Sequence, residues 1–203
     1  MKNMRLLVKF FFLIGIISAV IFVAVALSAS YIIFISHSTI GVTPEDERFM
    51  NLSYELAQSS YDHGDIPVGA VLVVNGTIIS SSETTAVRTG DFRNHAEMIV
   101  INDALNKLHI HDFRELRGST VTLYTSYEPC AMCEGFIVYT SLPRVVVGAR
   151  KSYLHEIIEE YFNHIVYRFN ERGGISEQTQ KSLLTKYMSD MKSKYGRINS
   201  QDI

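Results

Sequence analysis

The feature that most restricts this chain is a set of three metal-binding side chains in two short segments. His95 lies in the sequence Asn-His-Ala-Glu, and Cys130 and Cys133 lie in the sequence Glu-Pro-Cys-Ala-Met-Cys. Imidazole and thiolate groups are typical zinc ligands. The two cysteines are three residues apart, so a helix would place them on one face. Three protein ligands leave a fourth coordination position open, which is typical of a catalytic zinc rather than a structural one.

Glu97, two residues after His95, is the candidate acid–base group. Zinc lowers the pKa of a bound water from about 16 to about 7, so the hydroxide that forms near neutral pH needs a partner to carry its proton. Residues i and i+2 of a regular helix point about 200° apart. We therefore expect His95 at the start of a helix and Glu97 in its first turn. Pro129 suits the start of a second helix, whose N-terminus would stabilise cysteine thiolates.

The two segments together form a specific pattern. A Cys-x-x-Cys pair alone is also typical of a redox site, and a lone histidine is most often an ordinary surface or core residue. The combination His-x-Glu and Pro-Cys-x-x-Cys resembles the cytidine/deoxycytidylate deaminase family of zinc-dependent nucleobase and nucleoside deaminases. Residues 65–73, 128–135 and 144–150 are most similar to its branch of tRNA-specific adenosine deaminases and guanine deaminases. The resemblance covers about residues 44–150.

The resemblance carries expectations about fold, metal and assembly. It implies an α/β fold, a three-layer α/β/α sandwich of the cytidine deaminase-like type. It also implies a homodimer, and one zinc ion per chain on His95, Cys130 and Cys133, with Glu97 as the catalytic general acid/base. Hydrolytic deamination follows: water replaces an exocyclic amine, and ammonia leaves.

The substrate contacts are expected at three further positions. These are Thr84, Ala70 and Glu128. At the place of Thr84, found by counting back from His95, the branch carries an asparagine that binds the substrate. Tyr127 stands where the branch usually has leucine. These departures leave the expected deamination chemistry unaffected but argue against tRNA as the substrate. A threonine hydroxyl cannot make the bidentate contact of an asparagine amide.

Local patterns predict the order of the elements. Thr43-Pro44-Glu45-Asp46 is typical of a helix start, and the helix should end at 62–65. The run 66–74, the Asn75-Gly76 turn and the run 77–81 predict a β-hairpin. Further elements are expected as a polar loop over 82–93, a helix over 96–107, a strand over 120–125, the cysteine helix to Val138, a strand over 142–149, a helix over 154–161, a strand over 165–169, and a last amphipathic helix from Ser176 to about Lys194. Alternating strands and helices predict helices on both faces of a sheet.

The N-terminal segment differs from the rest of the chain. The run from Phe10 to Ile35 contains no charged residue, and it is long enough to span a bilayer. Because the core of a signal peptide usually covers about 7–15 residues, we favour an uncleaved anchor through residues 6–35 over a cleaved signal. The chain then divides into an N-terminal single transmembrane helix (1–36), a linker (37–43), the zinc deaminase core (44–150) and a C-terminal helical extension packed on the core (151–203).

The charge distribution bears on topology and partners. Lys2, Arg5 and Lys9 precede the uncharged run, and no Lys or Arg follows it until Arg48. The positive-inside rule then places the domain on the non-cytoplasmic side of the membrane. Without those three residues, the chain keeps 16 Lys+Arg against 21 Asp+Glu, a net charge of −5. This acidic balance does not favour nucleic acid as the main partner.

Three hypotheses about function follow. The first is a zinc-dependent hydrolytic deaminase of a small purine-type base or nucleoside. The second is a tRNA adenosine-to-inosine deaminase. The third is a membrane-tethered relic that binds zinc or a ligand without turnover. Glu97 argues against the relic, because a protein that only binds has no need of a proton carrier.

Overall fold

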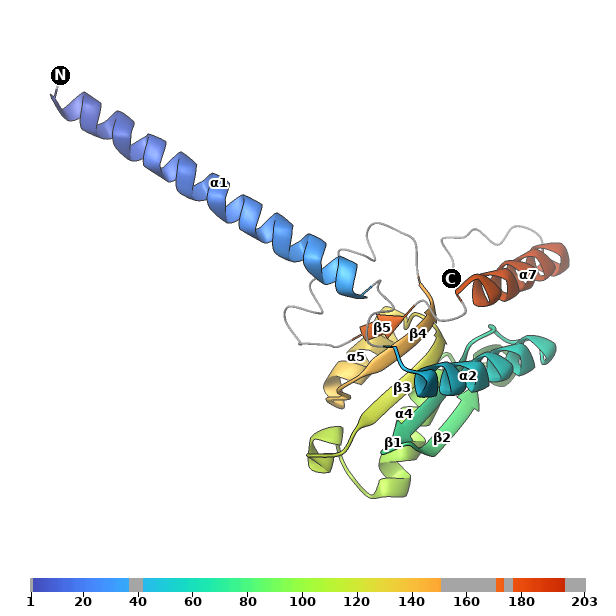
Figure 1. Cartoon of the computed structure of the whole chain (residues 1–203). Coiled ribbons are helices and arrows are strands. Elements are labelled where there is room, and N and C mark those ends of the chain that lie inside the picture. Colours follow the sequence, from blue (N-terminus) through green and yellow to red (C-terminus); the bar gives the residue numbers. More distant parts are fainter. Residues whose placement is uncertain (1, 37–41, 151–170, 174–176, 196–203) are drawn as a thin grey trace.

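In the part of the chain that the structure describes, a mixed five-stranded sheet forms the centre of the domain (Figure 1). The computed structural model describes residues 2–36, 42–150, 171–173 and 177–195. The strand order is β2-β1-β3-β4-β5, with bounds β1 Gly69–Val74, β2 Thr77–Glu83, β3 Val121–Tyr127, β4 Val145–Ala149 and β5 Glu171–Gly173. β1 is antiparallel to both β2 and β3, whereas β3, β4 and β5 are parallel. The helix and strand expected over 154–161 and 165–169 lie outside the described residues.

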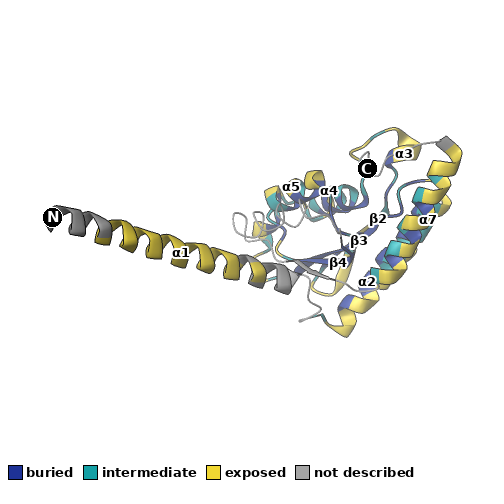
Figure 2. Ribbon diagram, turned by 90° about the horizontal axis from the view of Figure 1, so that it is seen from above, coloured by how far each residue is buried: buried dark blue, intermediate teal, exposed yellow. Residues whose placement is uncertain are grey.

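Helices cover both faces of the sheet, which confirms the predicted α/β layering. One face carries α4 (Ala96–Leu108) and α5 (Ala131–Tyr139), and α5 connects the parallel strands β3 and β4. The other face carries α2 (Pro44–Asp62), with α7 (Glu177–Tyr195) beside it (Figure 2). The expected last helix, from Ser176 to about Lys194, agrees with α7.

Alternation along the strands divides the core in two. Ala70 and Leu72 of β1 pack under α4 and α5, while Val71 and Val73 pack under α2. Successive strand residues point to opposite faces, so a sheet covered on both sides needs apolar residues at every position. This explains why β1 reads as a continuous apolar run.

The predicted hairpin forms at Asn75-Gly76. Both residues have positive φ, 48° and 76°, as the two-residue turn between twisted strands requires. The Asn75 side chain also accepts a hydrogen bond from the Thr120 N–H at 2.9 Å, which ties the turn to the start of β3. A register shift between Leu72 and Val73 marks a bulge that the sequence pattern did not predict.

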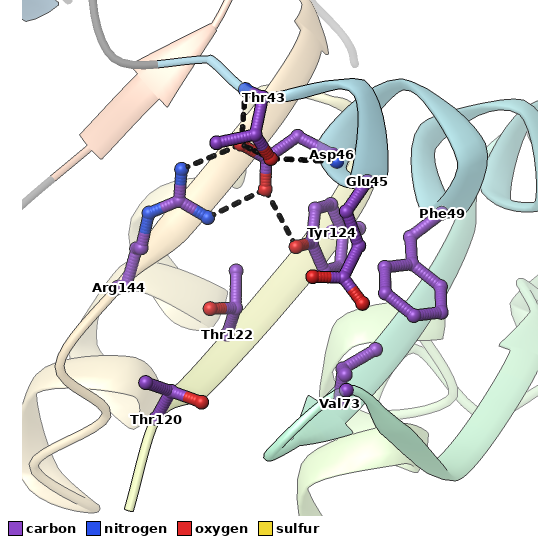
Figure 3. Close-up of a pocket in the computed structure, with 10 residues that line it drawn as sticks. Thr43, Glu45, Asp46, Phe49, Val73, Thr120, Thr122, Tyr124 and Arg144 are labelled. Carbon is purple, nitrogen blue, oxygen red and sulfur yellow. Dashed lines mark hydrogen bonds and ion pairs between the residues drawn. The ribbon is translucent and has the colours of Figure 1, made fainter.

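The start of α2 is held by its own cap and by the sheet (Figure 3). Thr43 and Asp46 form the reciprocal capping box, since the Asp46 N–H donates to Thr43 Oγ1 and the Thr43 N–H donates to Asp46 Oδ2. The same carboxylate accepts hydrogen bonds from Tyr124 of β3 and from Arg144, the residue before β4. A polar hollow of about 350 Å³ opens beside this network, at the amino ends of β3 and β4.

The long helix α1 (Lys2–Ser36) is the N-terminal element. Its segment Lys9–Ser28 has a mean hydropathy of 3.0, and the side chains in that segment are all exposed (Figure 2). By length and composition alone this helix could cross a membrane, and a signal sequence would meet the same criteria. The membrane anchor therefore stays a prediction.

Candidate metal centre

The start of α4 carries the first metal ligand, as the sequence predicts. His95 is the N-cap residue in an extended conformation, with φ −72° and ψ 145°. Its side chain makes no capping hydrogen bond, because the imidazole is directed at the two cysteines. Glu97 lies in the first turn of α4 and is 3% exposed. Both expectations about this helix start are confirmed.

The second segment leaves the carboxyl end of β3. The Glu128 N–H donates to the carbonyl of Ala149 at 2.9 Å, which extends the pairing of β3 with β4 up to the metal ligands. Cys130 is then the N-cap of α5, and Cys133 lies in its first turn. The helix begins at Ala131, two residues later than a helix with Pro129 in its first position, since Pro129 precedes the cap residue.

The three ligand atoms lie at the separations that zinc requires. His95 Nδ1 is 3.6 Å from Cys130 Sγ and 3.5 Å from Cys133 Sγ, and the two sulfurs are 3.6 Å apart. Tetrahedral zinc, with bonds of about 2.3 Å to sulfur and about 2.0 Å to nitrogen, holds its ligand atoms about 3.5–3.8 Å apart. His95, Cys130 and Cys133 are thus positioned to hold one metal ion.

The electrostatics of the protein groups also call for a cation. The hydrogen bond from the Cys133 thiol lowers the pKa of Cys130 to about 3, with a further contribution from His95 and against the effect of burial. The same hydrogen bond and the burial of Cys133 raise the pKa of the Cys133 thiol far above its usual range. Two adjacent thiolates repel each other, so without a cation the pair keeps one proton. A divalent cation relieves that repulsion and binds both sulfurs as thiolates.

Glu97 is placed to carry a proton beside the ligands. Burial raises the pKa of its carboxyl group, and the nearby Cys130 sulfur adds to the effect. Thr125 Oγ1, on the neighbouring strand β3, lies 3.3 Å from Glu97 Oε1. The single hydrogen of the Thr125 hydroxyl can be donated to this carboxylate oxygen or to the carbonyl of Tyr127 at 2.9 Å. The sequence pattern gave no sign of Thr125, since it reads as one more β-strand residue.

The three predicted substrate residues lie around this centre. Thr84 is buried, and its hydroxyl accepts a hydrogen bond from the Ala96 N–H at 3.2 Å. Ala70 is fully buried on β1 and pairs with Thr125 of β3. Glu128 is 5% exposed and precedes the cysteine segment. Their contact with a substrate stays a prediction.

The loop between β2 and α4 contains a short helix that the sequence pattern missed. Residues 82–93 were expected as an irregular polar loop, but α3 (Ala86–Thr89) forms inside it. The buried carboxylate of Asp65 accepts hydrogen bonds from the N–H groups of Val87 and Arg88 at 2.6 and 3.3 Å. Because the partner lies more than twenty residues away, no local signal reveals this anchor.

Comparison with known proteins agrees with the site. The sequence model of the family described as cytidine and deoxycytidylate deaminase zinc-binding region matches residues 43–149. The chain is 31% identical over 157 residues to a tRNA-specific adenosine deaminase of Bacillus subtilis, covering 74% of this chain and 92% of that protein. It is 32% identical over 145 residues to a tRNA-specific adenosine deaminase of Rickettsia felis, and the match covers 68% of this chain and 96% of that protein.

Solved structures give the same answer for the fold. A structure of a tRNA:A34 deaminase superposes with a TM-score of 0.58 at 29% identity, over 68% of this chain and 99% of the other. A guanine deaminase from Nitrosomonas europaea superposes with a TM-score of 0.59 at 20% identity, over 72% of this chain and 85% of the other. At this identity, the match supports a shared fold only. The chain belongs to the cytidine and deoxycytidylate deaminase family, whose members are zinc-dependent hydrolases of C–N bonds.

Proposed function

We propose that this chain removes the exocyclic amine of a purine by hydrolysis. The observation that carries the proposal is the geometry of His95, Cys130 and Cys133, with the buried carboxylate of Glu97 beside them. Zinc, when bound, supplies a Lewis acid that lowers the pKa of a water molecule. The ligand set leaves one coordination position for that chemistry.

Glu97 carries the protons in this reaction. Its carboxylate accepts one proton from the attacking water and delivers it to the ring nitrogen, then accepts the second proton from the newly added hydroxyl group and delivers it to the departing amine. One C–O bond forms, the C–N bond breaks, and ammonia leaves. Burial excludes bulk water, which would otherwise compete for the proton.

A small purine base or nucleoside is the first candidate substrate. Thr84 accepts a hydrogen bond from Ala96 and keeps its own hydroxyl hydrogen available for an acceptor on the substrate. The net charge of −5 beyond the three N-terminal basic residues does not supply the attraction on which nucleic-acid binding usually depends. The charge balance favours a small base or nucleoside over a nucleic acid.

Adenosine within tRNA is the second candidate, and the relatives favour it. The curated proteins from B. subtilis and R. felis are both tRNA-specific adenosine deaminases, and this chain spans more than nine-tenths of each. The two candidates differ in where the domain must lie, because tRNA is found in the cytoplasm. The basic residues before the uncharged run favour the other side of the membrane.

We also propose a homodimer through α5. Met132 is 40% exposed and Tyr139 is 82% exposed, and seven residues make about two turns of helix, so both lie on one face. A contiguous exposed apolar patch is typical of an interaction surface, and we propose that these two side chains belong to one. Light scattering of the full-length chain in detergent should give twice the protomer mass, and the Tyr139→Glu variant should reduce it to one protomer.

The proposed activity is tested by ammonia release. Full-length zinc-loaded protein in detergent is incubated with adenine, guanine, adenosine, guanosine, the corresponding nucleotides and a tRNA anticodon stem-loop. We expect turnover of a free purine or nucleoside, abolished in the Glu97→Ala variant. Inosine formation in the stem-loop alone would establish the second candidate. No turnover of the whole panel by zinc-loaded wild-type protein would contradict both.

A further inference from the structure

The start of α4 lacks the cap that a helix usually has. Ser, Thr, Asp and Asn are preferred at the N-cap because their side-chain oxygens accept hydrogen bonds from first-turn N–H groups. His95 occupies that position, but its imidazole faces the cysteine sulfurs. A capping side chain at this position would accept from the second or third N–H of the helix, and it would not reach the first. The N–H of Ala96, a fully buried residue, needs an acceptor from elsewhere.

Thr84 supplies this acceptor from the end of β2. Its Oγ1 accepts the hydrogen bond of the Ala96 N–H at 3.2 Å, across 12 residues of sequence. The backbone of Thr84 is itself fixed, because its N–H donates to the carbonyl of Val68 at 2.9 Å and its carbonyl accepts from Ser60 Oγ at 3.0 Å. The residue before β1 and helix α2 therefore fix the backbone that carries the hydroxyl.

We propose that Thr84 is a positioning residue of the metal centre, because its hydroxyl holds the first N–H of α4, between the ligand His95 and the proton carrier Glu97. Ala96 stands between His95 and Glu97, so a hydrogen bond to its N–H fixes the backbone from which both side chains project. Partners behind metal ligands typically affect metal affinity by about 10- to 100-fold. The proposal rests on the zinc site of the proposed function and not on the identity of the substrate.

The test compares variants of the full-length chain in detergent. Thr84→Val keeps the shape of the side chain and removes the acceptor, while Thr84→Ser keeps the hydroxyl. Thr122→Val is the matched control, because Thr122 is a buried threonine at the far end of β3, beside the hollow of Figure 3. Zinc affinity is measured by chelator competition. The absorption bands of the Co²⁺-substituted protein report the geometry of the ligands.

We expect Thr84→Val to weaken zinc binding about tenfold and to shift the Co²⁺ bands, with both effects reversed in Thr84→Ser. Thr122→Val should leave both unchanged. Wild-type zinc affinity and spectrum in Thr84→Val would overturn the proposal, as would equal effects in Thr122→Val. These measurements need no substrate. The positioning role of Thr84 can therefore be contradicted while deaminase activity is found, and it can be supported while no deaminase activity is found.

Amide hydrogen exchange gives a measurement that does not depend on how a variant folds. In the metal-free wild-type chain, the Ala96 N–H should remain protected, since its acceptor is Thr84 and not a metal ligand. Rapid exchange of this amide in the metal-free, folded chain would show that Thr84 does not hold the helix start.

Discussion

Arg144 donates two hydrogen bonds to the carboxylate of Asp46, at 2.7 and 2.9 Å, across 98 residues of sequence. Burial alone would raise the pKa of Asp46, but hydrogen bonds from Arg144, Tyr124 and Thr43 outweigh it and hold this pKa well below its usual range. Asp46 thereby joins the first turn of α2 to β3 and to the start of β4 (Figure 3).

The first prediction concerns acid stability. A carboxyl group with a depressed folded-state pKa contributes stability above its unfolded pKa of about 3.9, and this contribution is lost as the pH falls through that value toward the folded pKa. We expect Asp46→Asn to lower the free energy of unfolding at pH 7 by about 3 kcal/mol, because Arg144 loses its buried partner. Below about pH 5, the free energy of unfolding of the variant should also fall less steeply with decreasing pH than that of the wild type. Urea unfolding from pH 3 to 7 measures both, and parallel curves for variant and wild type would contradict the assignment.

The second prediction concerns the metal. His95→Ala, Cys130→Ala and Cys133→Ala should each lose the zinc that wild-type protein holds at about one ion per chain, because each removes one of three convergent ligands. Elemental analysis after dialysis against a weak chelator measures the content. Full zinc in either cysteine variant would show that the ion lies elsewhere.

The third prediction separates metal binding from proton transfer. Glu97→Gln should keep the zinc content and the fold, since Glu97 is no ligand in the proposed site. Turnover should fall by at least about 10²- to 10⁴-fold, the usual contribution of a general acid–base. Single-turnover ammonia release measures the loss. Near-normal release would assign the proton transfer to another group.

The fourth prediction concerns packing of α2 on β1. A Cβ atom at Gly69 would lie 2.2 Å from the carbonyl oxygen of Ser53 and 2.5 Å from Leu56 Cβ, so the helix would have to move. Gly69→Ala should therefore cost at least about 1–3 kcal/mol, as overpacking does. Gly135→Ala is the control, because nothing lies within 4 Å of its added methyl group. Thermal unfolding should show a loss only in the first variant.

The fifth prediction concerns the anchor. Residues 6–35 should keep the full-length protein in the membrane fraction after carbonate extraction. Protease added to spheroplasts should digest the domain, as the positions of Lys2, Arg5 and Lys9 predict. Release by carbonate would contradict the anchor, and a domain that stays intact until the membrane is opened would reverse the topology.

The parts of the fold that sequence alone predicted are those with local causes. The Asn75-Gly76 turn, the Thr43 cap and the placement of His95 before Glu97 depend on neighbouring residues, and the structure confirms each. Long-range partners account for what was missed. Asp65 accepts a hydrogen bond from α3, and Thr125 contacts Glu97. In both cases the partners are distant in sequence and come together only when the chain folds.

The direction of β3 and β4 has a consequence for access. The chain enters the domain at Thr43, beside the amino ends of these strands, whereas Cys130 and Cys133 follow the carboxyl end of β3. Seven residues, 37–43, separate α1 from α2, and an extended chain of that length reaches about 25 Å. If α1 lies in a bilayer, the tether keeps the hollow side of the domain near the lipid surface. The metal ligands lie at the opposite edge of the sheet, so the point where the chain is tethered and the point where a purine would bind are at different ends of the strands.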